Sequence, residues 1–209
     1  MSVSTIKEKT VRELIDNALS QAISYGDYRA MVNQLALEGK ATGPNQTEAL
    51  ANYTMLNDRR MKRFDKTVKV SDAQIETIKK LDRKITFLVL TESWCGDASP
   101  SLPVMNKITE HTEKIDFKVV LRDEHEALMN RFLTNGAMSI PKLIILDSET
   151  KEVLGDWGPR PQPAAQMVLD HKAQYGKIMP ELKEELQQWY NKDKGQTILN
   201  ELLASLPLK

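Results

Sequence analysis

The pattern of apolar and polar positions divides the chain into three stretches. Up to about residue 82, apolar residues recur at helical spacing, as Val11, Leu14 and Ile15 do. The segment 39–46, which holds two glycines and a proline, interrupts that pattern. The first stretch is therefore predicted to consist of helices separated by a loop.

Two more helices are predicted in the second half of this stretch. One is expected from about Thr47 to Phe64, where apolar positions again keep helical spacing. Ser71 is followed three places later by Gln74, which is the spacing of a capping box. A further helix is therefore expected to begin directly after Ser71.

Three short, continuous apolar runs mark the middle of the chain. Residues 85–91, 116–121 and 142–147 are rich in β-branched side chains, a pattern typical of strands buried on both faces. Helix-length segments, at 96 to about 112 and at about 124 to 134, lie between them. Strands that alternate with helices predict βαβ units and an α/β sheet.

The last stretch is predicted to begin with a hairpin and to continue as helices. Residues 151–157 follow a polar turn and can pair antiparallel with the preceding strand. A helix is expected to end at Gly176, and another to begin at Pro180. Gly195 interrupts this helix, and the apolar face from Ile198 to Leu206 is expected to pack internally or in a homodimer.

Composition and charge exclude several classes of protein. Of 209 residues, 41% are hydrophobic and 28% are charged, and 29 basic residues balance 29 acidic ones. This balance gives no electrostatic footprint for a nucleic acid or a membrane surface. No window reaches the roughly 18 apolar residues of a membrane span, and no secretory signal is evident. The single cysteine excludes an internal disulfide and favours a cytoplasmic location.

That cysteine, Cys95, is the leading candidate for chemistry. It follows a predicted buried strand and precedes a predicted helix, and Gly96 permits the turn between them. Free N–H groups and the positive end of the helix dipole favour a thiolate at such a position. We expect Cys95 in an exposed or semi-exposed loop at the carboxyl edge of the sheet, where α/β folds bind ligands. The alternative is a buried, inert cysteine.

The middle of the chain resembles a thioredoxin. Trp94, Cys95 and Gly96 match the first three positions of the thioredoxin Trp-Cys-Gly-Pro-Cys motif. Pro103 matches the proline that kinks the next helix, and Ile140-Pro141 matches the cis-proline that faces the active cysteine. A family glycine corresponds to Gly158. The flanks look like those of stand-alone bacterial thioredoxin-like proteins with a helical N-terminal extension.

This resemblance implies an α/β thioredoxin-like fold, with a central mixed sheet flanked by helices and extra helices at both termini. The implied organisation is a helical extension over residues 1–82, a thioredoxin-like domain over residues 83–176 and a C-terminal helical segment over residues 177–209. No cofactor is implied.

Three departures from the thioredoxin pattern bear on activity. Ala98 occupies the place of the resolving cysteine, so a mixed disulfide would need an external thiol for its release. Val89 occupies the place of a buried aspartate that assists proton transfer in thioredoxins. Asp97 replaces the motif proline, and its carboxylate suits the helix dipole but opposes a nearby Cys95 thiolate.

Two hypotheses of function follow from the resemblance. In the first, Cys95 performs monothiol thiol–disulfide exchange with client protein thiols or glutathione, and an external thiol completes the cycle. Ser139, Ile140 and Pro141 would then hold the substrate chain. Trp157 and Arg160 would line a groove or recognise a carboxylate, such as that of glutathione; the alternative is a proline-rigidified loop that leads into the last helices. In the second hypothesis the chain is a non-catalytic adaptor that keeps the thioredoxin groove without its chemistry.

Other candidate sites are weaker. The acidic residues around His125 are consecutive and do not share a helix face, so a solvated helix start is expected rather than a metal site. The basic run 59–66 is interrupted by an acidic residue and is expected to be a solvated helix face. His111 and His171 are expected at the surface. The sequence contains no phosphate-binding glycine loop and no zinc-type cysteine spacing.

Overall fold

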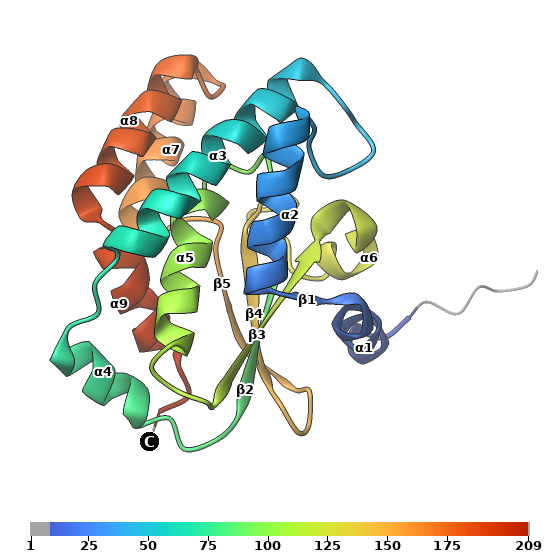
Figure 1. The fold of residues 1–209 in the computed structure, drawn as a ribbon, viewed down its shortest axis with the longest axis vertical. Helices are drawn as coiled ribbons and strands as arrows, with labels where there is room; N and C mark the ends of the chain where they lie inside the picture. Colours follow the sequence, from blue (N-terminus) through green and yellow to red (C-terminus); the bar gives the residue numbers. More distant parts are fainter. Residues whose placement is uncertain (1–8, 209) are drawn as a thin grey trace, which may run out of the picture.

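A computed structural model describes residues 9–208 of the chain (Figure 1). The strands are β1 (Ile23–Ser24), β2 (Ile85–Thr91), β3 (Ile115–Leu121), β4 (Lys142–Asp147) and β5 (Val153–Trp157). The helices are α1 (Val11–Gln21), α2 (Tyr25–Glu38), α3 (Glu48–Thr67), α4 (Asp72–Lys79), α5 (Ala98–Thr109), α6 (Glu126–Met129), α7 (Gln162–Tyr175), α8 (Pro180–Asp193) and α9 (Gln196–Ser205), with a short 3-10 helix, η1 (Arg122–Glu124), before α6.

The strands form one mixed sheet in the order β1-β3-β2-β4-β5. Strand β2 pairs parallel with β3, and β4 pairs antiparallel with both β2 and β5. The three predicted strands and the hairpin are thus confirmed. Strand β1 was not predicted, because its two residues are too few to show a period; they pair antiparallel with β3.

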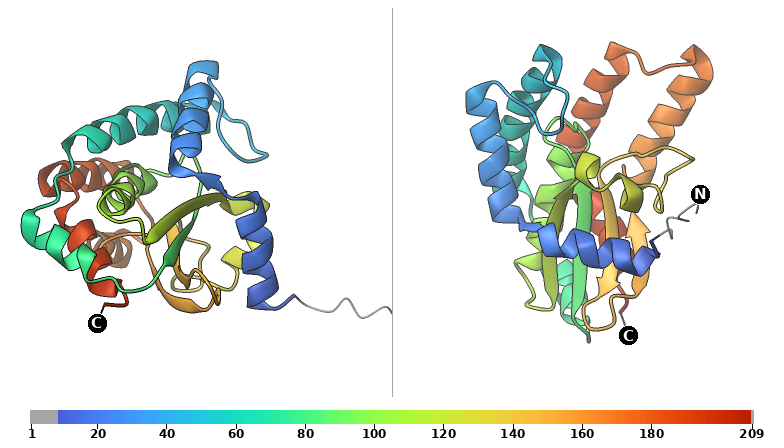
Figure 2. Two further views of the ribbon diagram at one scale, coloured as in Figure 1. Left: turned by 60° about the horizontal axis from the view of Figure 1, so that its bottom comes forward. Right: turned by 90° about the vertical axis from the view of Figure 1, so that its right-hand side faces the viewer.

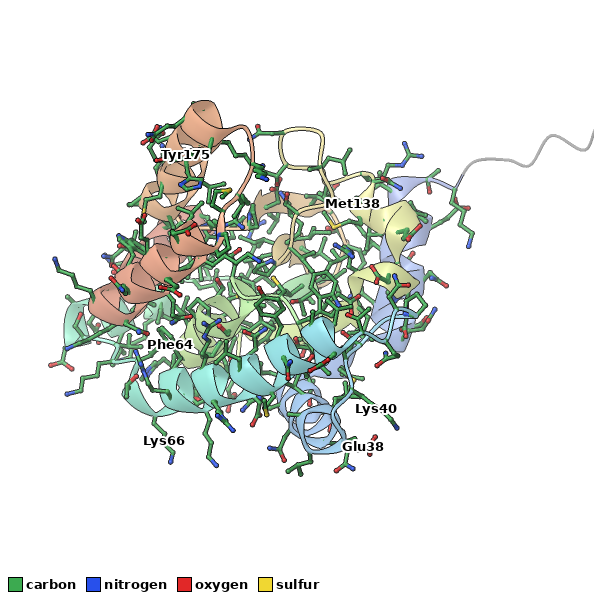
Figure 3. The ribbon with its side chains drawn as sticks, turned by 90° about the horizontal axis from the view of Figure 1, so that it is seen from above. Glu38, Lys40, Phe64, Lys66, Met138 and Tyr175 are labelled. Carbon is green, nitrogen blue, oxygen red and sulfur yellow. The ribbon has the colours of Figure 1, made fainter. Side chains whose placement is uncertain are left out.

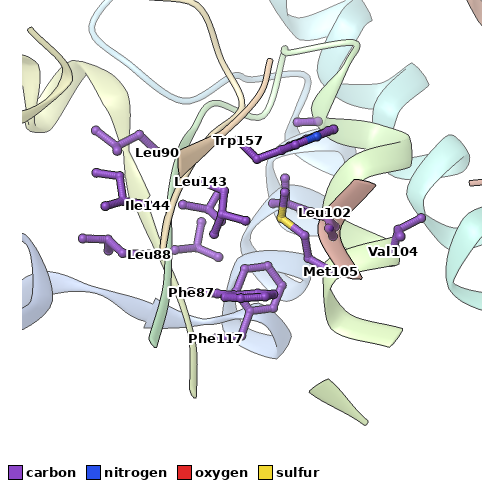
Figure 4. Close-up of a cluster of buried hydrophobic side chains, with 14 of the residues drawn as sticks. Phe87, Leu88, Leu90, Leu102, Val104, Met105, Phe117, Leu143, Ile144 and Trp157 are labelled. Atoms are coloured by element: carbon purple, nitrogen blue, oxygen red, sulfur yellow. The ribbon is translucent and has the colours of Figure 1, made fainter. Parts of the chain in front are cut away.

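Strand β2 is the centre of the core, and all seven of its residues are buried. Successive side chains of a strand point to opposite faces of the sheet. Phe87 therefore lies with Leu102 and Met105 of α5, whereas Leu88 and Leu90 point to the other face (Figure 4). Because both faces of β2 are apolar, both must be covered by helices.

Helices cover both faces of the sheet. Helices α5 and α9 lie on one face, and α1 with α6 lies on the other (Figures 1 and 2). Helix α3 packs across α5 and also against α2. The pairs α2–α3 and α7–α8 extend beyond the carboxyl end of β2 on different sides of the molecule (Figure 2). The architecture is the predicted thioredoxin-like α/β fold with additional helices at both termini.

Local signals in the sequence place most helix ends correctly. The capping box of Ser71 and Gln74 is formed at the start of α4. Gly176 ends α7 in the left-handed conformation, with φ of 73°. Helix α8 begins at Pro180, and Gly195, with φ of 79°, separates it from α9. Side-chain hydrogen bonds fix the start of α4, whereas the backbone preferences of glycine and proline fix the other boundaries.

The helix predicted at about 124 to 134 is much shorter in the structure. The structure contains η1 and the four-residue α6, and an irregular loop follows. Asn135 and Gly136 both have positive φ, and Thr134 pairs with Ala137 across them. Asn-Gly is the preferred pair for such a tight turn, so the end of the expected helical segment forms a turn instead.

The helices outside the predicted central domain share its core. Ile15 of α1, Phe64 of α3 and Leu199 of α9 are fully buried and belong to the same apolar cluster as Phe87. Burying large apolar side chains is worth roughly 1.5–3 kcal/mol each. The terminal helices therefore contribute to the stability of the sheet that they cover.

Gly158, directly after β5, approaches the backbone before β4 so closely that no side chain fits. A Cβ on Gly158 would lie 2.2 Å from the carbonyl oxygen of Pro141, and φ is +117°. We expect Gly158→Ala to lower the free energy of unfolding by about 2–4 kcal/mol in urea denaturation. Gly155→Ala, where a Cβ meets no atom within 4 Å, is the matched control. Equal stability of the two variants would contradict this account.

Candidate functional site

The candidate site is the loop between β2 and α5, at the carboxyl end of β2. Cys95 donates its backbone N–H to the carbonyl of Glu92 at 3.1 Å, and Ser99 donates to the carbonyl of Gly96 at 3.3 Å. These short-range bonds turn the chain from the strand into the helix. They place Cys95 three residues before the first residue of α5.

The thiol of Cys95 faces the loop that precedes β4. Its Sγ donates to the carbonyl oxygen of Ile140 at 3.2 Å, and the Ile140–Pro141 peptide is cis. Cys95 is only 6% exposed. The loop itself is semi-exposed, as expected, because Gly96 is exposed and Trp94 and Asp97 are half-buried, but the thiol within it is buried. The loop does lie at the sheet edge, but other segments pack around it.

The electrostatic surroundings keep this thiol protonated. Burial above all, together with the Asp97 carboxylate, raises the pKa of Cys95 to about 12. The backbone N–H groups of Ala98 and Asp97 and the guanidinium of Arg160 act in the opposite direction but are outweighed. Loss of hydration around a thiolate therefore exceeds the stabilisation that the helix N-terminus provides. The net effect of Asp97 on the Cys95 pKa, which was open at the sequence level, is upward.

Asp97 joins three distant segments at the start of α5. Its Oδ2 lies 2.6 Å from Nη2 of Arg160, in the loop after β5. Its Oδ1 accepts a hydrogen bond of 2.9 Å from the hydroxyl of Tyr190 on α8. The Asp97 side chain is 14% exposed, and burial raises its pKa, whereas its two partners favour the ionised form. This group of three side chains, the Asp97 cluster, stabilises the approach of α8 to the cysteine loop.

A polar network ties the segment 39–46 to the other side of the cysteine loop. Thr42 and Ser93 exchange backbone-to-hydroxyl hydrogen bonds of 2.9 and 2.8 Å. The fully buried Glu92 accepts from the Thr42 hydroxyl and, at 2.9 Å, from the backbone N–H of Asp123. Burial raises the pKa of Glu92. A buried carboxyl group needs such donors, so this network fixes the loop from the N-terminal side.

Arg60 of α3 also reaches the cysteine loop. Its Nη1 lies 3.9 Å from the point that a Cβ on Gly96 would occupy, and burial lowers its pKa. The sequence placed 59–66 on a solvated face, and Lys66 does project away from the body while Phe64 lies against it (Figure 3). Arg60 follows the buried Asn57 by three residues. Helical spacing from that residue is the signal that could have placed Arg60 inward.

The remaining predicted site residues differ in how deeply they are buried. Trp94 is half-buried, and the Arg122 guanidinium lies 5.0 Å from its ring centroid. Ala98 and Pro141 are buried, whereas Ser139 is half-buried. Trp157 contacts α9: its Nε1–H donates a hydrogen bond of 2.8 Å to the Glu201 carboxylate.

His125 does not lie in a solvated helix start as expected. It is 5% exposed, between η1 and α6, and burial lowers its pKa. His111 and His171 are half-buried, and His171 accepts a hydrogen bond from the backbone N–H of Met179 at 3.3 Å. No group of three or more potential metal ligands occurs among residues 9–208.

The parallel and antiparallel strand pairing, the cysteine at the start of α5 and the proline that faces it define a thioredoxin-like protein. A family model described as thioredoxin matches residues 43–194, which is more than half of the chain. The chain belongs to the thioredoxin family. The match includes α3 and α4, which precede β2, and all of α8.

Two solved structures share the fold. One is a Pseudomonas aeruginosa protein of unknown function, PA1234, which is 22% identical with a TM-score of 0.56; the match covers 72% of this chain and 83% of that one. The other is an HIV epitope scaffold that is 18% identical with a TM-score of 0.54, covering 88% and 97% of the two chains. No curated protein matches. Within the described part of the chain, no helix has the length and apolar character to cross a membrane.

The Asp97 carboxylate provides a direct test of the site's electrostatics. Asp97→Asn removes a negative charge beside the sulfur and frees Arg160 from its partner, so the pKa of Cys95 should fall. Each unit of decrease raises the thiolate fraction at neutral pH about tenfold. We expect alkylation of Cys95 by iodoacetamide at pH 7 to become at least about tenfold faster. Asp116→Asn, at an exposed carboxylate of β3, is the control; similar rates in both variants would refute the assignment.

Proposed function

We propose that the chain is a thioredoxin-fold binding protein that receives a client chain beside Pro141 while Cys95 remains a protonated thiol. The observation that carries this proposal is the contact between Cys95 Sγ and the Ile140 carbonyl at 3.2 Å, within a buried site. A thiol donates to a carbonyl, whereas a thiolate would be repelled by it. The resting site is therefore arranged around a neutral sulfur.

The backbone before Pro141 supports a binding role. The N–H of Ile140 forms no hydrogen bond with any other described residue. An extended client segment has a carbonyl to offer to such a donor, and main-chain pairing of this kind gives affinity without specifying sequence. Ser139 is half-buried beside it. Ser139, Ile140 and Pro141 are thus the proposed contact residues, as the resemblance to thioredoxins also implies.

Two buried positions speak against a dithiol redox cycle. Ala98, which stands where a resolving cysteine would be, is 2% exposed and has no chemistry to offer. Val89, in place of the proton-transferring aspartate, is buried within the apolar centre of β2. The Asp97 carboxylate, which does act on the Cys95 pKa, opposes a thiolate.

Monothiol exchange is the second candidate, and one observation favours it. The backbone N–H groups of Ala98 and Asp97 both stabilise a negative charge on Cys95. A thiolate formed there would attack a client disulfide, form a mixed disulfide and release the other client sulfur as a thiolate. Glutathione or another external thiol would then attack the mixed disulfide and regenerate Cys95. A single cysteine suits a reducing compartment, so a cytoplasmic location belongs to both proposals.

The rate of Cys95 alkylation by iodoacetamide as a function of pH separates the two candidates. With the pKa of Cys95 raised to about 12 by burial, we expect the rate to rise across the whole alkaline range. At pH 7 it should be at least about 100-fold lower than the rate of N-acetylcysteinamide. Fast alkylation with a midpoint below about 8.5 would reject the protonated resting thiol and favour exchange.

Replacement of the sulfur separates the candidates by a different readout. Cys95→Ser retains a hydroxyl that can donate to the Ile140 carbonyl. For a binding protein, the variant and the wild type should recover the same client with similar affinity, with or without a reducing agent. Loss of the client in the variant, together with its release from wild type by dithiothreitol, would support the mixed disulfide instead.

A further inference from the structure

Arg60 is a half-buried cation without an acidic partner among the residues that the structure describes. The hydrogen bond that it forms within residues 9–208 joins its Nη1 to the amide oxygen of Asn57 at a long 3.4 Å. No carboxylate of the described chain lies within salt-bridge distance of Arg60, although it is close enough to Asp97 for the two charges to interact. A buried charge is costly unless it is paired. Arg60 therefore has a charge that a bound anion would compensate.

The cysteine loop carries an excess of positive charge at this point. Arg60 approaches it from α3 and Arg160 from the loop after β5, whereas Asp97 supplies one carboxylate. Cys95 is neutral as a thiol. At Asp97, two cations, Arg160 and Arg60, therefore act on one carboxylate. Moreover, Nε of Arg160 is buried and has no hydrogen-bond partner among the described residues.

We propose that Arg60 and Arg160 form a carboxylate-binding site beside Cys95, so that the ligand received next to Pro141 carries a carboxylate. This inference rests on the proposed binding function and names the chemistry of its ligand. Guanidinium groups present planar pairs of N–H donors that match a carboxylate. A single net positive charge suits a monoanion better than a phosphate dianion, which Asp97 would repel.

The reaction of Cys95 with two alkylating reagents tests the site. Iodoacetate and iodoacetamide react alike: the thiol loses its proton to solvent, an S–C bond forms and iodide leaves. They differ in that only iodoacetate carries a carboxylate. The ratio of the two rates, divided by the same ratio for N-acetylcysteinamide, reports the attraction of a carboxylate to the site. Because both reagents need the same thiolate, the pKa of Cys95 cancels in the ratio.

We expect this normalised ratio to be about fivefold or more in favour of iodoacetate for the wild-type protein at low ionic strength. Arg60→Gln should bring it close to one, and Arg60→Lys, which keeps the charge, should preserve most of it. Arg59→Gln is the matched control, because Arg59 is the exposed neighbour on the same helix. A wild-type ratio near one, or equal ratios in Arg60→Gln and Arg59→Gln, would overturn the proposal.

Protection of Cys95 from iodoacetamide identifies the source of the carboxylate. S-methylglutathione represents glutathione, and as a thioether it cannot form a disulfide. An acidic peptide with blocked termini represents a client side chain. Protection by either probe that is lost in Arg60→Gln supports the site and assigns its source. Protection by neither overturns it. The absolute alkylation rate, in contrast, tests only whether the resting thiol of Cys95 is protonated. Failure of the carboxylate site can therefore be distinguished from failure of the proposed function.

Discussion

The complete burial of β2 is the constraint on which the rest of the structure depends. A strand that is apolar on both faces needs helices on both sides, and its chain must still leave the sheet through a loop with polar backbone groups. Here several segments from other parts of the chain enclose that loop. The loop at 39–46, α3, the loop before β4 and α8 all contact residues between Glu92 and Asp97.

The site shows two opposing effects on one sulfur. A helix N-terminus stabilises an adjacent anion by about 0.3–1 kcal/mol at the surface and by up to about 2 kcal/mol in partly buried geometries. Desolvation of a fully buried group shifts its pKa by up to about 3–5 units, at about 1.4 kcal/mol per unit. Desolvation therefore wins for Cys95, and the same motif that activates an accessible cysteine leaves a neutral thiol here.

The sequence predicts the fold well because the signals that define it are local. The apolar runs of β2 and β4, the capping box at Ser71 and the glycine after α7 each specify an element without reference to the others. The position of Cys95 between strand and helix also follows from local pattern. Its burial does not, because the segments that enclose it lie far away in the chain.

The same limit explains the residues that were missed. Arg60 belongs to a basic run whose charge pattern indicates a solvated face, and only its spacing from Asn57 places it inward. The pairing of Asp97 with Arg160 and Tyr190 spans more than sixty residues. His125 is buried because α1 packs against α6, a contact that no local pattern specifies.

The hydrogen bonds between Thr42 and the cysteine loop bear on whether this loop could keep its properties in another protein. Glu92 and Ser93 belong to the loop itself, yet Thr42, one of the residues that donate to them, lies about fifty residues earlier in the chain. If residues 92–98 were grafted onto another thioredoxin, Glu92 would lose the hydroxyl that Thr42 donates, and Cys95 would lose the segments that enclose it. The chemistry of Cys95 thus depends on the whole chain, because the N-terminal segment forms part of the site itself.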